Sequence, residues 1–179
     1  MVLAGKPRLC LGQRMSHEPH DKLLPDDAAP KRPGLVLVNE GQWAGWYHYE
    51  PADAFEDHTG PFYCQPDGDR GIVCGFLPDA KNCNAGGNIH GGSLMTFADY
   101  ALFMIAGGMD ASVHGVTVTC NNEFVGAAEP GRLLTARGEV IRAGFSMVFV
   151  RGVISDGDRP VMAFSGTIKR VPGGQKGNG

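Results

Sequence analysis

Apolar and polar positions alternate most regularly after residue 70 of the chain. Residues 72–77 form an apolar run of strand length, and the following loop, 83–92, contains four glycines in ten residues. The stretch 93–106 predicts a helix of about 14 residues, or roughly 21 Å at 1.5 Å per residue. Its positions are apolar on nearly every face, and a helix without a polar face is a buried helix. A glycine pair at 107–108 ends it.

Four segments with the character of strands follow this helix, at 116–125, 133–142, 145–155 and 160–170. Their connections are short turns rich in Gly, Pro and Asp. Such connections are too short for crossover helices, so the strands must run antiparallel. We therefore predict an α+β fold in which an antiparallel sheet wraps around one central buried helix. A single sheet covers only part of so apolar a helix, which predicts a homo-oligomer.

The first third of the chain has a different pattern. Residues 1–34 contain five prolines and few bulky apolar side chains, and we expect a disordered tail there. Residues 35–54 form an extension rich in aromatic residues, residues 55–171 the domain itself, and residues 172–179 a frayed end. The aromatic residues between 35 and 63 either pack this N-terminal segment onto the domain or line a ligand pocket. They are Trp43, Trp46, Tyr47, Tyr49, Phe55, Phe62 and Tyr63.

Composition excludes several classes of function. The 179 residues suffice for one domain, and 16 basic against 19 acidic residues give a net charge of −3, without the basic stripe of a nucleic-acid binder. No apolar run is long enough for a membrane span, and the N-terminus lacks the apolar region of a secretory signal. The five cysteines are odd in number and form no C-x-x-C pair. This favours a reducing, cytoplasmic location over a disulfide framework or a zinc site.

The start of the predicted helix carries candidate chemistry. The first N–H groups of a helix lack partners within it and carry partial positive charge, and glycine at 91 and 92 lets another molecule approach them. Such a site can bind an anion or stabilise an oxyanion. Asp99 is the one charged residue of the helix. A lone buried carboxylate is costly unless it is paired, so a catalytic role is favoured over a structural one.

Two residues of the loop remain open on chemical grounds alone. His90 is either a core histidine or a polar group that faces substrate, and Asn84 either shapes the loop or donates a hydrogen bond in the site. The Cys and His residues show no ligand spacing such as H-E-x-x-H, so we expect no metal. Walker A, Rossmann and G-x-S-x-G patterns are absent as well.

The loop and helix together resemble a known family. The spaced motif is similar to the signature of hotdog-fold acyl-CoA thioesterases of the PaaI-like branch, and the resemblance extends over about residues 55–171. The motif is Asn84-x-x-Gly87-x-x-His90-Gly91-Gly92, followed by Phe97-Ala98-Asp99. The resemblance implies hydrolysis of acyl-CoA thioesters without a cofactor, since coenzyme A enters with the substrate.

The resemblance also implies roles for individual residues. Asp99 would activate water or attack the thioester, and the Gly91 N–H would polarise the thioester carbonyl. His90 and Asn84 would orient substrate or water. Thr117 would contact water or substrate, or would be only a β-forming residue on its strand.

Two further implications concern the rest of the motif and the assembly. Gly87 and Gly92 would contact the substrate. The site would lie at the subunit interface of a homodimer or homotetramer, with Asp99 and Thr117 contributed by different chains.

Two other functions remain as alternatives. One is an acyl-thioester hydratase or dehydratase of the same fold, although its His-plus-acid pattern is not found here. The other is a non-catalytic acyl-CoA-binding module, which would keep the glycine loop but would not need Asp99. The reaction product separates the three: free thiol indicates a hydrolase, a change at the α,β bond a lyase, and binding alone a module.

Overall fold

A computed structural model describes residues 31–51, 53–111 and 113–171. Within them, eight strands form one antiparallel sheet in the order β1-β2-β3-β4-β6-β7-β8-β5. The strands are β1 Leu35–Leu37, β2 Tyr47–Tyr49, β3 Phe62–Pro66, β4 Ile72–Phe76, β5 Gly115–Phe124, β6 Leu134–Ala143, β7 Met147–Asp156 and β8 Arg159–Arg170. The helices are α1 Ala54–Thr59 and α2 Gly91–Gly107, with 3-10 turns at Gly41–Trp43, Gly68–Arg70 and Ala80–Asn82.

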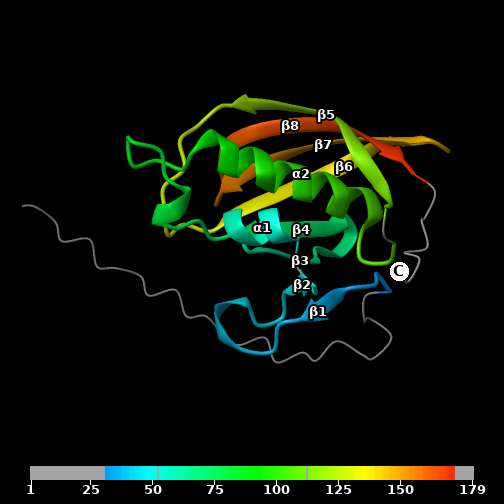
Figure 1. Cartoon of the computed structure of the whole chain (residues 1–179), viewed down its shortest axis with the longest axis horizontal. Coiled ribbons are helices and arrows are strands. Elements are labelled where there is room, and N and C mark those ends of the chain that lie inside the picture. The colour runs from blue at the N-terminus through cyan, green and yellow to red at the C-terminus, as the bar shows by residue number, and fades with distance from the viewer. Residues whose placement is uncertain (1–30, 52, 112, 172–179) are drawn as a thin grey trace, which may run out of the picture.

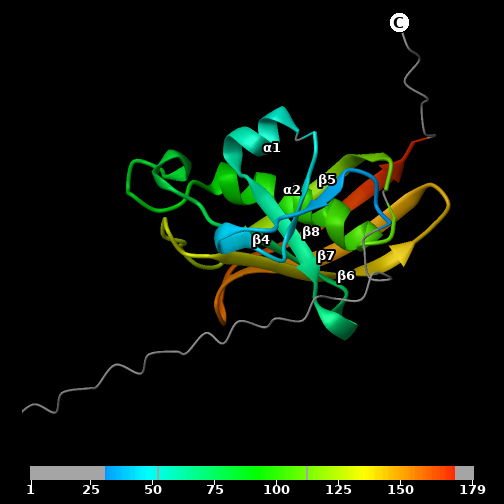
Figure 2. The same ribbon diagram turned by 90° about the horizontal axis from the view of Figure 1, so that it is seen from below.

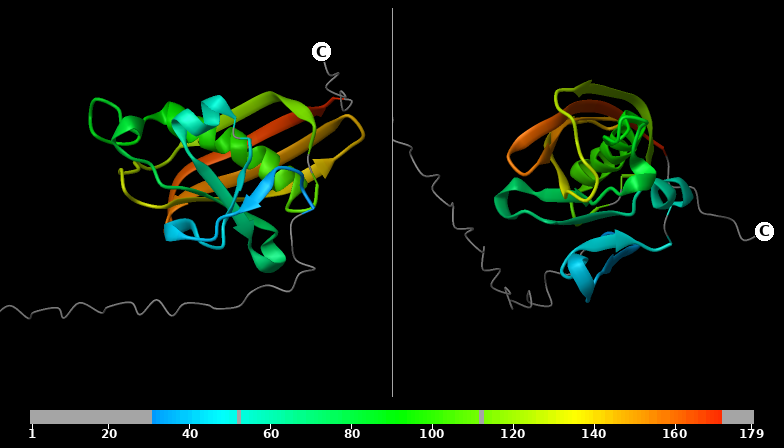
Figure 3. Two further views of the ribbon diagram at one scale, coloured as in Figure 1. Left: turned by 60° about the horizontal axis from the view of Figure 1, so that its bottom comes forward. Right: turned by 90° about the vertical axis from the view of Figure 1, so that its left-hand side faces the viewer.

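The sheet curls around α2, with the short α1 beside it (Figure 1 and Figure 3). Helix α2 buries eight of its seventeen side chains, against β3–β8. The predicted α+β hotdog architecture is confirmed, and each predicted strand after residue 70 is present within two residues of its expected ends. The helix starts two residues earlier than expected, at Gly91, because His90 caps it.

The aromatic extension continues the same sheet rather than standing apart from it. Strand β2 pairs with both β1 and β3, and Figure 2 shows this N-terminal segment lying across β4. The Trp43 ring stacks on Tyr63 with centroids 4.0 Å apart. A Cβ at Gly75 of β4 would lie within 3 Å of both indoles, of Trp43 and of Trp46, so glycine there makes room for them. Of the two interpretations, the structure supports packing of the extension onto the domain.

Arg32 lies inside the segment that the sequence predicts as a tail, yet it is only 5% exposed. Its Nη1 donates to the carbonyls of Phe103 and Gly108 at the end of α2, at 3.3 and 3.2 Å, and its guanidinium lies 5.3 Å from the Tyr49 ring centroid. A cation at a helix C-terminus stabilises the helix dipole. The prediction for residues 31–34 is therefore wrong, and residues 1–30 and 172–179 lie outside the described residues.

Candidate active site

The glycine-rich loop before α2 is closed by its own hydrogen bonds. The side-chain oxygen of Asn84 accepts from the N–H of Gly86 at 2.8 Å, and the Asn84 carbonyl accepts from Gly87 at 3.0 Å. Gly87 has a φ of +83°, which favours glycine. The structure thus shows Asn84 shaping the loop, and it gives Gly87 a role in the turn. Neither contact reaches Asp99.

At the N-terminus of α2, one backbone N–H is left open. The ring Nδ1 of His90 accepts from the N–H of Gly92 at 2.9 Å, and the carbonyl of His90 accepts from Ser93 and Leu94. Among the described residues, the N–H of Gly91 has no hydrogen-bond partner. An open donor at the positive end of a buried helix is a site for a carbonyl oxygen or an oxyanion.

The same cap changes the role expected for Gly92. Its N–H is taken up by His90, and a Cβ on Gly92 would lie 3.0 Å from that ring nitrogen. Glycine is thus needed here for the cap, not as a donor to substrate. His90 is an exposed N-cap rather than a core histidine. Because its Nδ1 accepts, a neutral His90 carries its proton on Nε2, which is left free to donate.

Asp99 and Thr117 form the second group of the site. The hydroxyl of Thr117 donates to Oδ1 of Asp99 at 2.7 Å, and both residues are partly buried. The implication that the two come from different chains is therefore corrected, since the contact lies within one chain. The hydroxyl fixes one carboxylate oxygen and leaves the other available, as a base or a nucleophile requires.

A bulge in β5 decides which of its side chains face α2. The pairing of β5 with β8 shifts between Thr117 and Thr119, so that Thr117 lies opposite Ile168, which is buried, and Phe124 lies opposite Met162, also buried. In a regular strand, the seven-residue separation would place Thr117 and Phe124 on opposite faces, and the extra residue of the bulge brings them to the same face. Both face the helix as a result.

Phe124 is the site residue that sequence analysis missed. A Cβ on Gly91 would lie 3.0 Å from the end of the Phe124 ring, so this ring lies directly over the first residue of α2. Phe124 follows Thr117 by seven residues, and regular alternation over an odd spacing predicts that the two side chains lie on opposite faces. Only the bulge turns the ring toward the helix.

The two groups lie far apart in one chain. Eight residues separate Gly91 from Asp99, which is about 12 Å along the helix axis. A carbonyl oxygen bound to the Gly91 N–H therefore stands too far from the Asp99 of the same chain for that carboxylate to act on its carbon. Within one chain, the two groups therefore do not meet at a single reacting centre.

Glu56 of α1 adds a second carboxyl near Asp99. Burial, and then the negative charges of Asp53 and Asp99, raise the pKa of Glu56 to about 7, while the Arg32 cation opposes the shift. A small cavity of about 30 Å³ lies beside it. Tyr100 also lines this cavity, and its hydroxyl is a buried group without a hydrogen-bond partner among the described residues.

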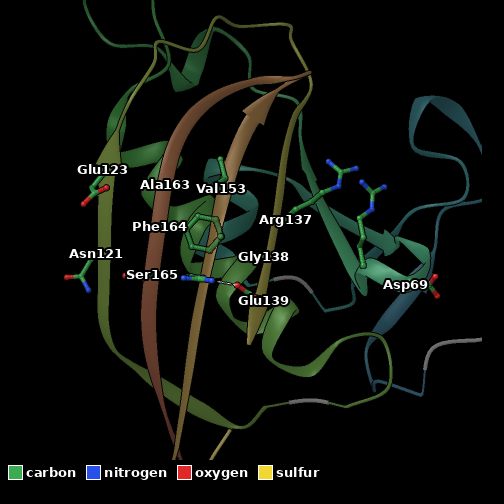
Figure 4. Close-up of a pocket in the computed structure, with 13 residues that line it drawn as sticks. Asp69, Asn121, Glu123, Arg137, Gly138, Glu139, Val153, Ala163, Phe164 and Ser165 are labelled. Carbon is green, nitrogen blue, oxygen red and sulfur yellow. Dashed lines mark hydrogen bonds and ion pairs between the residues drawn. The ribbon is translucent and has the colours of Figure 1, made fainter. Parts of the chain in front are cut away.

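A wide pocket of about 810 Å³ lies elsewhere (Figure 4). Residues of β5–β8 line it, most of them on the sheet face that points away from the core, and the turn before β4 completes the lining. Its arginines are already paired, Arg151 with Glu139 and Arg137 with Asp67. Neither Asp99 nor Gly91 lines it, so we do not assign the chemistry to this pocket.

Two further features, a metal site and a membrane-spanning helix, are absent from the part of the chain that the structure describes. No group of three His, Cys, Asp or Glu residues there could hold a metal ion. Nor does this part of the chain contain a helix that is both long and apolar enough to span a bilayer.

The similarity of this chain to known proteins points to one family. Residues 86–163 match the family model of the thioesterase superfamily. The chain is 36% identical to "Putative esterase PA0474" of Pseudomonas aeruginosa over 113 residues, 63% of this chain and 84% of that protein.

Solved structures share the fold at lower identity. The Escherichia coli PaaI protein from the phenylacetic acid degradation operon aligns with a TM-score of 0.60 and 22% identity, over 69% of this chain and 88% of that one. A hypothetical thioesterase of Streptococcus pneumoniae with coenzyme A aligns with a TM-score of 0.55 and 22% identity, over 62% and 88%.

Proposed function

The chain belongs to the thioesterase superfamily, and we propose that it hydrolyses acyl-CoA thioesters to the free acid and coenzyme A. One observation carries the proposal: the open Gly91 N–H and the Asp99 carboxylate held by Thr117 are the two parts that the reaction needs. The coenzyme A in the pneumococcal structure is consistent with this substrate.

The chemistry follows from these groups. The thioester carbonyl oxygen accepts a hydrogen bond from the Gly91 N–H, which stabilises the negative charge that develops when the carbonyl carbon is attacked. Asp99 either takes a proton from the attacking water or attacks the carbon itself. The tetrahedral intermediate then collapses, the C–S bond breaks, and coenzyme A leaves as a thiol with the proton that Asp99 took from water. On the nucleophilic route the thiolate leaves first and the acyl group stays on Asp99 as a mixed anhydride, which water then hydrolyses to the free acid while its second proton goes to the thiolate. The reaction needs no metal or cofactor beyond these groups and water.

Because the two groups of one chain are about 12 Å apart, the proposed site joins Gly91 of one chain to Asp99 of a second. A homodimer is the smallest assembly that completes it, and a homotetramer would contain two such dimers. Each dimer then holds two equivalent sites, as a twofold axis requires.

Strand β5 is the candidate contact between the two chains. It is ten residues long and stands at the end of the strand order, paired only with β8 in the described sheet. Its Val116 and Val118 side chains are more than half exposed. An edge this long and apolar favours pairing with another chain, and β5 carries Thr117, which holds Asp99.

The four cysteines among the described residues fit a reducing location. Cys64, Cys74, Cys83 and Cys120 all have free thiols. Free thiols persist where glutathione and thioredoxin keep them reduced. We place the enzyme in the cytoplasm as part of this proposal.

The experiment that tests the function is thiol release from a panel of acyl-CoA thioesters: phenylacetyl, benzoyl, acetyl, hexanoyl and palmitoyl. We expect the wild type to release thiol and Asp99→Asn to lose about 1,000-fold in kcat, within the range of general acid–base catalysis. The matched control is Asp158→Asn, an exposed carboxylate in the β7–β8 turn. It should match the wild type.

Near-wild-type turnover in Asp99→Asn would remove Asp99 from the mechanism. If no thioester is cleaved but acyl-CoA still binds, the chain is a binding module. A change at the α,β bond without thiol release would show a hydratase or dehydratase.

A further inference from the structure

The Phe124 ring is placed over the start of α2 by an irregularity in its strand. After the bulge between Thr117 and Thr119, the side chains that face the helix are those paired with Gly166, Phe164 and Met162 of β8. Phe124 is the last of them. It meets Gly91, whose missing Cβ would lie 3.0 and 3.2 Å from two ring carbons.

Core packing alone does not explain this ring. Phe124 is 53% exposed, whereas its strand partner Met162 is fully buried. The exposed part of the ring thus borders the space in front of α2. Met95, four residues after Gly91 and on the same helix face, is also 44% exposed. Two large, partly exposed apolar side chains therefore lie on the helix face that begins at Gly91.

We propose that Phe124 is a positioning residue for thioester hydrolysis: its ring is an apolar wall that excludes water from the Gly91 N–H and so keeps this donor free for the carbonyl oxygen. The inference rests on the proposed function. A donor acts on a developing oxyanion more strongly in a dry surrounding than in water. Removing the wall should therefore slow the chemical step rather than weaken substrate binding.

The kinetic test compares Phe124→Ala and Phe124→Leu with a neighbouring control, Val125→Ala. Val125 is 59% exposed and follows Phe124 directly, outside the strand. We expect Phe124→Ala to lose about tenfold in kcat, less than the roughly 100–1,000-fold that follows loss of an oxyanion donor, with KM within twofold. Phe124→Leu should recover most of the loss, and Val125→Ala should match the wild type. Gel filtration must show the same oligomer for all four proteins.

A second measurement does not depend on activity. Amide hydrogen exchange followed by NMR should show a faster rate at Gly91 in Phe124→Ala than in the wild type or Val125→Ala. The amides of Ser93 and Leu94, which are bonded to the His90 carbonyl, should keep their rates and serve as internal references.

The outcomes separate the inference from the function. If Phe124→Ala releases thiol with an unchanged kcat, the role of Phe124 is overturned and the function still stands. The same holds if the Gly91 amide of this variant exchanges no faster than that of the wild type. If the wild type cleaves no thioester, the proposed function fails and the positioning role fails with it. The exchange rates then still decide whether the ring shields Gly91.

Discussion

The two ends of α2 are built in opposite ways. At the C-terminal end, the buried Arg32 guanidinium donates to the carbonyls of Phe103 and Gly108. At the N-terminal end, His90 satisfies one N–H through its ring and two through its carbonyl, and the Gly91 N–H is left without a partner among the described residues. The C-terminal cap is a cation from a distant segment, whereas the N-terminal cap is local and leaves the first N–H of the helix open.

We infer from this difference that the Arg32 end of α2 serves stability and the Gly91 end serves the reaction. Unsatisfied polar groups at the end of a buried helix are costly, so a closed end is what folding favours. An open N–H on a glycine, next to an apolar ring, is what stabilisation of an oxyanion needs. Changes at the Arg32 end should therefore alter the free energy of unfolding, and changes at the Gly91 end should alter the rate.

The largest effect in this comparison should come from Gly91→Pro. Proline lacks the N–H but fits the first helical position, and the extended ψ of 137° at His90 suits a residue before proline. We expect kcat to fall by about 100–1,000-fold, with the helix intact by circular dichroism.

Gly91→Ala is the matched control for that variant. It brings the same Cβ against the Phe124 ring but keeps the N–H. The ratio of the two kcat values isolates the donor. Equal losses in both variants would show that the obstruction, and not the missing donor, is responsible.

At the other end, Arg32→Ala should destabilise the protein by about 2–3 kcal/mol, because two carbonyls lose a charged donor and the helix end loses its cation. Urea unfolding at one fixed protein concentration measures this. Lys31→Ala, at an exposed neighbour, should stay within about 0.5 kcal/mol of the wild type. A catalytic defect larger than the loss of folded protein would contradict the division between the two ends.

Thr117→Val should have a smaller effect on rate. Valine keeps the shape and the β propensity but removes the hydroxyl that donates to Asp99. We expect about a tenfold loss in kcat, in proportion to one hydrogen bond to a charged group. Thr119→Val, across the bulge and on the opposite face, is the control. If both variants lose equally, the hydrogen bond does not matter for turnover.

Glu56 should make the stability of the fold depend on pH. Its pKa is raised to about 7 in the folded chain, chiefly by burial, so the folded state binds more protons than the unfolded state between about pH 4.5 and 7. Stability should therefore fall as pH rises through this range and level off above it. In Glu56→Gln, the unfolding midpoint should no longer fall with pH over this range. At pH 8 it should be higher than the midpoint of the wild type. An unchanged slope would place the titration elsewhere.

Much of the fold follows from the sequence, because its signals are local. The apolar stretch of α2, the alternation of β5–β8 and the short turns between them predicted the helix, the strands and their antiparallel order. The spaced motif around His90 and Asp99 predicted the family, which the matches confirm.

Two of the features that sequence analysis missed depend on contacts between distant segments, and a third depends on the orientation of one side chain. The bulge at Thr117 shifts a strand by one residue without a composition signal, and it alone turns Phe124 toward the helix. Arg32 lies in a proline-rich stretch, and its burial depends on carbonyls more than seventy residues away. The capping role of His90 depends on which ring nitrogen faces Gly92.

The central claim is that Gly91 and Asp99 of different chains form one site, and mixed dimers test it most directly. Asp99→Asn and Gly91→Pro chains, each nearly inactive alone, are co-expressed with different tags and the mixed dimer is isolated. A site shared between chains predicts one intact site in that dimer, and so about half of the wild-type activity. A mixed dimer as inactive as its parents would contradict the claim, because it would mean that each site lies within a single chain.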